Sequence, residues 1–461
     1  MLRTLIADKG FYRKVFAVAI PIIIQSGITN FVSLLDNIMV GQVGTLPMSG
    51  VAIVNQLIFV FNLCIFGAVS GAGIFTAQFH GSGDQEGIRQ TFRFKFLLSM
   101  LLAVGGIILF LFAGKPLIRL YLQGDGDPAE LQQTLEYGLS YLGVMLVGLI
   151  PFALTNIYSS TLRETGQTVV PMVAGICAVL VNLSLNYVLI FGHFGAPAMG
   201  VRGAAWATVI SRYAELAIVM LWTHFHGEKN PFIRGAYRSM YIPAGLLLRI
   251  FRKGVPLLAN EFLWASGMAM LNQCYSTRGL DVVAAMNICS TLHNLSSVVF
   301  LSLGNVVGIL MGQMLGAGRP AEEIRTRNRQ MIALSVFSCL IFGGLMAAVS
   351  GLFPRIYQTT DGVRALAAAL ICVVAVAMPF SAYNHATYFT LRSGGKTFIT
   401  FLFDSGFTWC LSVPLAYCLS RFTHIPIVPM YALCNSLELI KCVLGTYMRE
   451  KGTWIQNLTN R

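Results

Sequence analysis

Apolar residues in this chain gather into runs of about 20 positions, and short polar stretches separate these runs. A helix of that length covers the roughly 30 Å of a bilayer core, at about 1.5 Å per residue. The pattern therefore predicts an all-α integral membrane protein with twelve spans. We place the spans at residues 16–38, 51–76, 95–114, 136–160, 169–192, 203–224, 254–276, 283–311, 331–353, 364–390, 398–419 and 426–447.

Composition agrees with this pattern, because 56% of the 461 residues are hydrophobic and only 11% are charged. The ten cysteines stand singly in apolar runs, without the paired spacing of a zinc or redox site, and we interpret them as core residues. Four basic residues precede the first span, but no short apolar core with a small-residue cleavage site follows them. The start is predicted to be a retained cytoplasmic end rather than a signal peptide.

The distribution of Lys and Arg predicts the orientation of the spans. Counted on alternate sides, the side of the N-terminus carries 23 of these residues and the opposite side carries seven, with Arg212 and Lys441 inside spans. Short loops rich in Lys and Arg stay in the cytoplasm, so both termini are expected there, in a multi-pass protein of the cell (inner) membrane. The net charge of +13 then reflects topology, and a nucleic-acid partner is not expected.

The chain contains an internal repeat. The segment PIIIQS (21–26) returns as PLLANE 235 positions later, QFHGSG (78–83) returns as QMLGAG at the same offset, and TLRETGQT (161–168) returns as TLRSGGKT at an offset of 229. With six spans in each copy, the copies share one orientation and form a parallel repeat about an axis along the membrane normal. The predicted domains are an N-terminal six-helix lobe (1–224), a cytoplasmic linker (225–250) and a C-terminal six-helix lobe (251–461).

Charged residues inside the predicted spans divide into paired and unpaired groups. Two pairs of opposite charge stand three residues apart on one helix face, so we predict that they are structural ion pairs: Arg212 with Glu215, and Glu438 with Lys441. Asp36, Glu261 and Asp404 have no such neighbour. An ionised acid at membrane depth is usually a functional group that faces protein or water. These three acids are therefore the candidates for an ion site.

Predicted depth in the membrane separates Asp36 from the other two acids. It lies 22 residues beyond Lys14, about 33 Å of helix, whereas Glu261 and Asp404 each lie eight residues beyond a cytoplasmic Lys. Asp36 is therefore expected in the outer half of the membrane. In the same span, Pro21 removes one helical hydrogen bond, which provides either a hinge or a static kink.

Two asparagines supply possible partners for Asp36. Asn182 and Asn186 stand four residues apart on one helix face, where their amides can orient a carboxylate or bind a hard cation through oxygen. The alternative is an ordinary hydrogen bond between helices. Weaker polar candidates in the spans are Asn156, Tyr158, Thr208 and His385, the last of a type that is more often a core residue.

These segments together resemble the multidrug and toxic compound extrusion (MATE) transporters in their bacterial form. The resemblance covers essentially the whole chain and rests on the order of its motifs, AIPIIIQSGITNFVSLLDNIMVGQVGT, TLRETGQTVVPM, NLSLNYVLIFG, GAAWATVISR, NEFLWASGM, MGQMLGAG and LRSGGKT. It implies two six-helix bundles that alternate between inward-open and outward-open states, driven by protons or sodium ions. It also implies that Asp36, Asn182 and Asn186 form the cation site of the N-terminal lobe, and that they are the metal ligands if the ion is sodium.

The second half departs from one branch of that family. That branch carries a carboxylate where this chain has Trp264, and an acidic residue where this chain has Ser381. A second sodium site of that type is therefore not supported in the C-terminal lobe, and Glu261 is a substitute only as a hypothesis.

The predicted function is export of amphipathic organic cations by a monomeric cation-coupled antiporter, without cofactor or catalysis. The nearest alternative is a lipid-linked oligosaccharide flippase of the same superfamily, which would need clustered cations to bind phosphates. Only Arg212 and Lys441 stand inside spans, both near acids. An intramembrane enzyme using His385 or a carboxylate is a further alternative, but the sequence has no HExxH or GxSxG motif.

Overall fold

The computed structural model describes residues 5–122 and 127–459, and within these ranges the chain is helical and contains no strand. The long helices are α1 (Lys9–Gly41), α2 (Thr45–Ser82), α3 (Gln85–Tyr121), α6 (Val169–Phe191), α7 (Val201–Phe225), α8 (Ala244–Ser276), α9 (Leu280–Gly316), α10 (Ala321–Val349), α11 (Asp361–Ser393) and α14 (Ile427–Glu450). Two further spans are interrupted helices, one made of α4 (Pro128–Met145), η2 (Leu146–Gly148) and α5 (Leu149–Glu164), the other of α12 (Thr397–Phe401), η6 (Leu402–Gly406), η7 (Thr408–Ser412) and α13 (Val413–Phe422). Short single turns connect them at η3 (His193–Gly195), η4 (Pro231–Ile233) and η5 (Phe353–Ile356).

These helices confirm the predicted all-α membrane fold. Each predicted span overlaps one long helix or interrupted helix, and most helices extend beyond the predicted spans, by ten residues at the starts of α3, α8 and α10. Among the described residues, eleven of these segments are long and apolar enough to cross a membrane. The remaining segment is α8, whose first half carries Arg249, Arg252 and Lys253.

Local sequence determines where several of these helices begin and end. The carboxylate of Asp127 accepts a hydrogen bond of 3.0 Å from the backbone nitrogen of Ala129, and a proline opens α4 directly after it. The hydroxyl of Thr360 accepts one of 3.3 Å from the backbone nitrogen of Val363 at the start of α11. Gly192 ends α6 in a left-handed conformation, with φ of 76°, that glycine adopts without steric penalty.

The chain forms two compact units, and neither is one continuous segment. We call the first the N-unit, which comprises Ile24–Thr76 and Gln85–Leu248. The second is the C-unit, which comprises the chain up to Ile23, the segment Ala77–Asp84 and the chain from Arg249 onward. The start of α1 and the end of α2 therefore belong with the C-terminal helices, although the predicted N-terminal lobe includes both.

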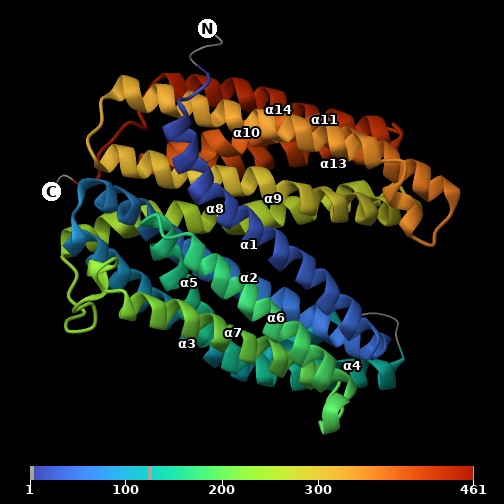
Figure 1. Cartoon of the computed structure of the whole chain (residues 1–461). Helices are drawn as coiled ribbons and strands as arrows, with labels where there is room; N and C mark the ends of the chain where they lie inside the picture. The colour runs from blue at the N-terminus through green and yellow to red at the C-terminus, as the bar shows by residue number, and fades with distance from the viewer. Residues whose placement is uncertain (1–4, 123–126, 460–461) are drawn as a thin grey trace. The chain divides into compact units, whose positions relative to one another are not determined.

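In the C-unit, helices α9, α10, α11 and α14 lie side by side (Figure 1). The start of α1 adds Val15, Val18, Ala19 and Ile22 to the buried core of this unit. In the N-unit, α6 packs along α7, and α5 packs against both α3 and α7. Close packing is what holds such helices together, because lipid removes the hydrophobic force between them.

Two glycine motifs of the repeat cross inside the C-unit. A Cβ atom at Gly81 of α2 would overlap the backbone carbonyl group of Gln313 in α9. A Cβ atom at Gly316 of α9 would overlap the backbone carbonyl group of Gln78 in α2. The contact is reciprocal, because the two glycines and the two glutamines are each 235 positions apart. The repeated sequence thus provides the small residues that membrane helices need for a close crossing.

Most of the predicted linker belongs to the N-unit, where two arginines of α3 hold it. Arg93 is buried, and its guanidinium donates to the carbonyl oxygens of Gly235 (3.1 Å), Ala236 (2.8 Å) and Tyr241 (3.2 Å). Arg89 donates in the same way to the carbonyl oxygens of Pro231 (3.3 Å) and Phe232 (3.1 Å). Residues 231–241 are therefore fixed by the side chains of α3 rather than free to move as a chain connector.

Replacing Arg93 with Met should release this segment. Hydrogen bonds from a charged group contribute about 1.5 to 3 kcal/mol each, so amide hydrogen exchange in residues 231–241 should accelerate about tenfold to a hundredfold. Mass spectrometry of exchanged peptides measures this directly. Arg234→Met is the matched control, because Arg234 lies exposed in the same segment and should leave the exchange unchanged. Equal exchange in both variants would show that the arginine contacts do not hold the segment.

Candidate ion site

Three helices of the N-unit bring the polar candidates together. Asp36 lies near the end of α1, Asn182 and Asn186 lie on α6, and Thr208 lies on α7. Nδ2 of Asn186 donates to Oδ1 of Asp36 at 2.5 Å and to Oδ1 of Asn182 at 3.1 Å. The side chains are well sheltered, because Asn182 is 6% exposed and Asn186 is 1% exposed.

The spacing of the asparagines explains why both reach the carboxylate. Four residues correspond to slightly more than one helical turn, so Asn182 and Asn186 stand above one another on one face of α6. That face is turned toward α7, and the amide nitrogen of Asn182 lies 3.4 Å from the hydroxyl oxygen of Thr208. Among the weaker candidates, Thr208 is therefore the one that joins this cluster.

The amide of Asn182 can serve either protonation state of Asp36. One of its two terminal atoms lies 2.8 and 3.1 Å from the two carboxylate oxygens. If that atom is nitrogen, it donates to an ionised carboxylate. If it is oxygen, the two oxygens repel unless a proton or a cation lies between them. The hydrogen bonds of this amide therefore depend on whether Asp36 is charged or neutralised.

The other weaker candidates lie away from Asp36. Asn156 donates to the carbonyl oxygen of Phe152 in its own helix at 2.9 Å. The hydroxyl of Tyr158 lies 2.6 Å from that of Tyr237 and 3.0 Å from Nε2 of His224, where the linker packs on α5 and the end of α7. His385 belongs to the C-unit, where its Nδ1 lies 3.2 Å from the carbonyl oxygen of Ser381. These three residues therefore make hydrogen bonds that stabilise the local packing, and none of them contacts Asp36.

Tyr237 lies in the linker, outside the predicted spans, and its hydroxyl forms a hydrogen bond with that of Tyr158. Burial raises the pKa of Tyr237 above its usual value, so its hydroxyl stays protonated at neutral pH and can donate to Tyr158. The two hydroxyls therefore join Tyr237 of the linker to Tyr158 of α5.

The structure corrects the predicted ion pairs. Lys441 pairs with Asp404 at 2.9 Å rather than with Glu438 three residues before it. Glu438 instead accepts a hydrogen bond of 2.7 Å from the amide of Asn384. Asp404, expected to be unpaired, therefore has a cationic partner. Both side chains take partners on adjacent helices instead of each other, because a buried acid is held by the donor that packing brings closest.

The other predicted pair, Arg212 with Glu215, does not form an ion pair in the described part of the chain either. Arg212 donates to the carbonyl oxygen of Gly148 at 3.1 Å and lies 4.9 Å from the ring centre of Phe152. No salt bridge joins it to Glu215 in the described part of the chain. A carbonyl and an aromatic face satisfy the guanidinium in place of the acid.

Several polar contacts in the structure were not predicted from the sequence. Asn260 of α8 donates to Asp404 at 3.1 Å, beside the candidate Glu261, which lies within range of the charge of Arg392. Lys95 and Glu164 form a buried ion pair of 2.5 Å in the N-unit. The repeat could have pointed to Asn260, because it places this amide residue 235 positions after Gln25, which is also an amide.

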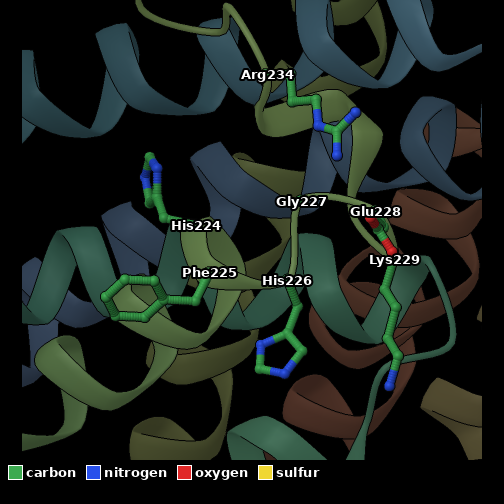
Figure 2. A pocket seen from close by; sticks show the side chains of 7 residues that line it. All are labelled: His224, Phe225, His226, Gly227, Glu228, Lys229 and Arg234. Carbon is green, nitrogen blue, oxygen red and sulfur yellow. The ribbon is translucent and has the colours of Figure 1, made fainter.

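The described chain also has a surface cavity of about 280 Å³ at the end of α7, away from these polar clusters. Its lining consists of His224, Phe225, His226, Gly227, Glu228, Lys229 and Arg234. Figure 2 shows that the charged ends of Lys229 and Arg234 point in different directions. The cations therefore do not converge on one anion, and none of the predicted ion-site residues lines this cavity.

In the described part of the chain, eleven apolar helical segments long enough to cross a membrane, with polar clusters inside each unit, give the architecture of a multi-pass membrane transporter. The MatE family model matches this chain at residues 21–188 and again at 256–418, so the protein belongs to the MatE family of transporters. The two matches begin 235 positions apart, at the same offset as the repeat in the sequence.

Relatives and solved structures agree with this assignment. The chain is 24% identical over 421 residues to "Probable multidrug resistance protein NorM" of Thermotoga maritima, covering 90% of this chain and 86% of that protein. It is 26% identical over 413 residues to "Multidrug resistance protein PmpM" of Pseudomonas aeruginosa, covering 88% and 83%. A solved outward-facing structure of a multidrug resistance MATE family transporter superimposes with a TM-score of 0.87 at 18% identity, covering 98% of each chain. That similarity shows the shared fold.

Proposed function

We propose that this multidrug-efflux family member is an antiporter that exports amphipathic organic cations in exchange for protons or sodium ions. The observation that carries this proposal is the partly buried carboxylate of Asp36, held by amides of Asn182 and Asn186 and by no cation among the described residues. A lone acid in that setting gains from binding a proton or a cation. Asp36 is then the residue at which the coupling ion is taken up and released.

The amide of Asn182 supplies the switch in this mechanism. With Asp36 charged, Asn182 and Asn186 both donate to the carboxylate. With Asp36 protonated, the new hydroxyl donates to the oxygen of Asn182, and the amide nitrogen of Asn182 turns toward Thr208, 3.4 Å away. Each unit of pKa difference for Asp36 between the inward and outward states corresponds to about 1.4 kcal/mol of coupling.

The surroundings favour an amphipathic cation as substrate. Phe31, on α1 before Asp36, leaves 54% of its surface exposed, and Trp206 stands two residues before Thr208 on α7. Aromatic faces attract organic cations and also bind their apolar parts. Curated relatives of this chain carry the name of multidrug resistance proteins, which agrees with a broad substrate range.

A flippase for phosphate-linked lipids has less support. Arg212 is satisfied by a carbonyl group and an aromatic ring, and Lys441 is paired with Asp404. Neither cation is therefore available to bind a phosphate without losing its present partner.

Transport into proteoliposomes tests the proposed function. Vesicles that hold the purified protein should accumulate ethidium when a proton gradient or a sodium gradient is imposed separately, and protein-free vesicles should not. The gradient that drives uptake identifies the coupling ion. Uptake that proceeds equally without any gradient, or that requires ATP, would contradict antiport.

Pro21 is expected to act as a hinge of α1 during this cycle. The helix passes from the C-unit to the N-unit between Ile23 and Ile24, two residues after Pro21. Replacing Pro21 with Ala restores a helical hydrogen bond, so turnover should fall several-fold while thermal stability is kept or raised. Pro116→Ala in α3 is the control and should not slow transport. Unchanged turnover in Pro21→Ala would identify the proline as a static kink.

A further inference from the structure

The repeat places leucines where the N-unit has its ion site. An offset of 235 carries Asp36 of α1 to Leu271 of α8. An offset of 229 carries the two asparagines of α6 to positions in the last interrupted helix, which are Leu411 and Leu415. The C-unit therefore has no polar copy of this site at the repeated positions.

The C-unit has a different polar cluster, and the repeat offsets connect its positions to positions in the N-unit. The same two offsets carry Gln25 to Asn260 and Gly175 to Asp404. In the N-unit, the side chain of Gln25 packs on Gly175, at 3.1 Å from where a Cβ atom of that glycine would lie. In the C-unit, Asn260 donates to Asp404 at 3.1 Å. The equivalent contacts show that the offsets relate corresponding positions in both units, and that the C-unit has a carboxylate, Asp404, where the N-unit has Gly175.

That carboxylate already holds a cation supplied by the protein. Oδ1 of Asp404 lies 2.9 Å from Nζ of Lys441, while Oδ2 accepts from Asn260. The Lys441 nitrogen also lies 5.3 Å from the ring centre of Phe403 and 5.9 Å from that of Phe407. The side chains of Asp404 and Lys441 are 19% and 10% exposed. A carboxylate and two aromatic faces form the kind of cage that binds an ammonium group.

The backbone around Asp404 is unusual as well. Leu402–Gly406 and Thr408–Ser412 are π-helical, and this rare geometry often marks functional positions in a helix. The oxygen of the Asn260 amide accepts from the hydroxyl of Ser405 at 2.7 Å, next to Asp404. This hydrogen bond fixes the amide orientation, so that its nitrogen faces the carboxylate.

We propose that Lys441 is the resident cation of the C-unit and occupies, at Asp404, the place that a second coupling ion would take. Each transport cycle then exchanges one ion, at Asp36. A tethered ammonium is present at a far higher effective concentration than a dissolved ion, so it keeps the site filled through the cycle. This inference rests on the proposed antiport function. It assigns the exchange of the coupling ion to the N-unit alone.

Ion stoichiometry tests the role of Lys441. In wild-type proteoliposomes, one monovalent ion exchanged for one ethidium cation moves no net charge. An ion gradient of about tenfold should then sustain an ethidium gradient of about tenfold, independent of an imposed membrane potential. Replacing Lys441 with Met frees Asp404 to bind a second ion, so the limiting ethidium gradient should rise toward about a hundredfold and become sensitive to the potential.

The double variant Asp404→Asn with Lys441→Met removes both charges and should return the exchange to one ion per ethidium. If the single variant fails to fold, the wild type still tests the proposal, because an exchange of two ions per ethidium would show that Lys441 does not restrict the protein to one ion. Wild-type exchange of two ions per ethidium, or a Lys441→Met protein that keeps one-for-one exchange, would overturn the role of Lys441. Absence of gradient-driven uptake by the wild type would instead overturn the proposed function.

Discussion

Asp36→Asn should reduce gradient-driven efflux to the level of protein-free vesicles, with insertion and folding intact. The amide is close in size to the carboxylate and keeps a partner in Asn186, but it cannot ionise or be neutralised by a cation. Without that change, ion binding no longer favours one conformation over the other. The measurement is ethidium uptake in proteoliposomes under the driving gradient.

Asp281→Asn is the matched control for this substitution. Asp281 lies exposed in the first turn of α9, so its replacement removes one carboxylate without touching either buried cluster. Its transport should equal that of the wild type. Full gradient-driven transport by Asp36→Asn would remove this carboxylate from the coupling mechanism.

Gly316→Ala should lower the free energy of unfolding by about 1 to 3 kcal/mol, as overpacking against immobile atoms does. The added methyl group would overlap the carbonyl group of Gln78, and backbone atoms in a helix cannot rotate away as a side chain does. Gly81→Ala should have a similar effect, because the repeat places the same contact on the other helix. Thermal unfolding of the purified protein in detergent measures both.

Gly105→Ala in α3 is the matched control for the crossing. Nothing lies within 4 Å of a Cβ atom at Gly105, and alanine favours a helix over glycine by about 1 kcal/mol. Its stability should be unchanged or slightly raised. Equal stability of Gly316→Ala and Gly105→Ala would show that the α2 and α9 backbones do not meet closely.

The spans, the repeat and the main polar cluster followed from the sequence because each has a local or periodic signal. A run of apolar residues of fixed length identifies a membrane helix, and a lone acid within it stands out. The four-residue spacing of Asn182 and Asn186 then places both on one helix face, and the structure brings both to Asp36. Their role in ion coupling stays a prediction.

The partners of the remaining charges depended on packing between distant helices. Lys441 had an acid three residues before it on its own helix, yet it pairs with Asp404, which stands 37 positions earlier in the chain. Arg93 and the linker carbonyls are more than 140 positions apart. The assignment of the start of α1 to the C-unit likewise depends on tertiary contacts, since Pro21 marks a possible bend in the helix but does not indicate which helices its first half packs against.

Ion release on substrate binding tests the exchange at Asp36 most directly. Ethidium added to purified protein in weakly buffered detergent solution, with proton and sodium concentrations followed by electrodes, should displace about one ion per protein, because linkage between two ligands is reciprocal. Asp36→Asn should displace none. Ethidium binding to the wild type that leaves both ion concentrations unchanged would contradict an exchange of ion for substrate at this carboxylate.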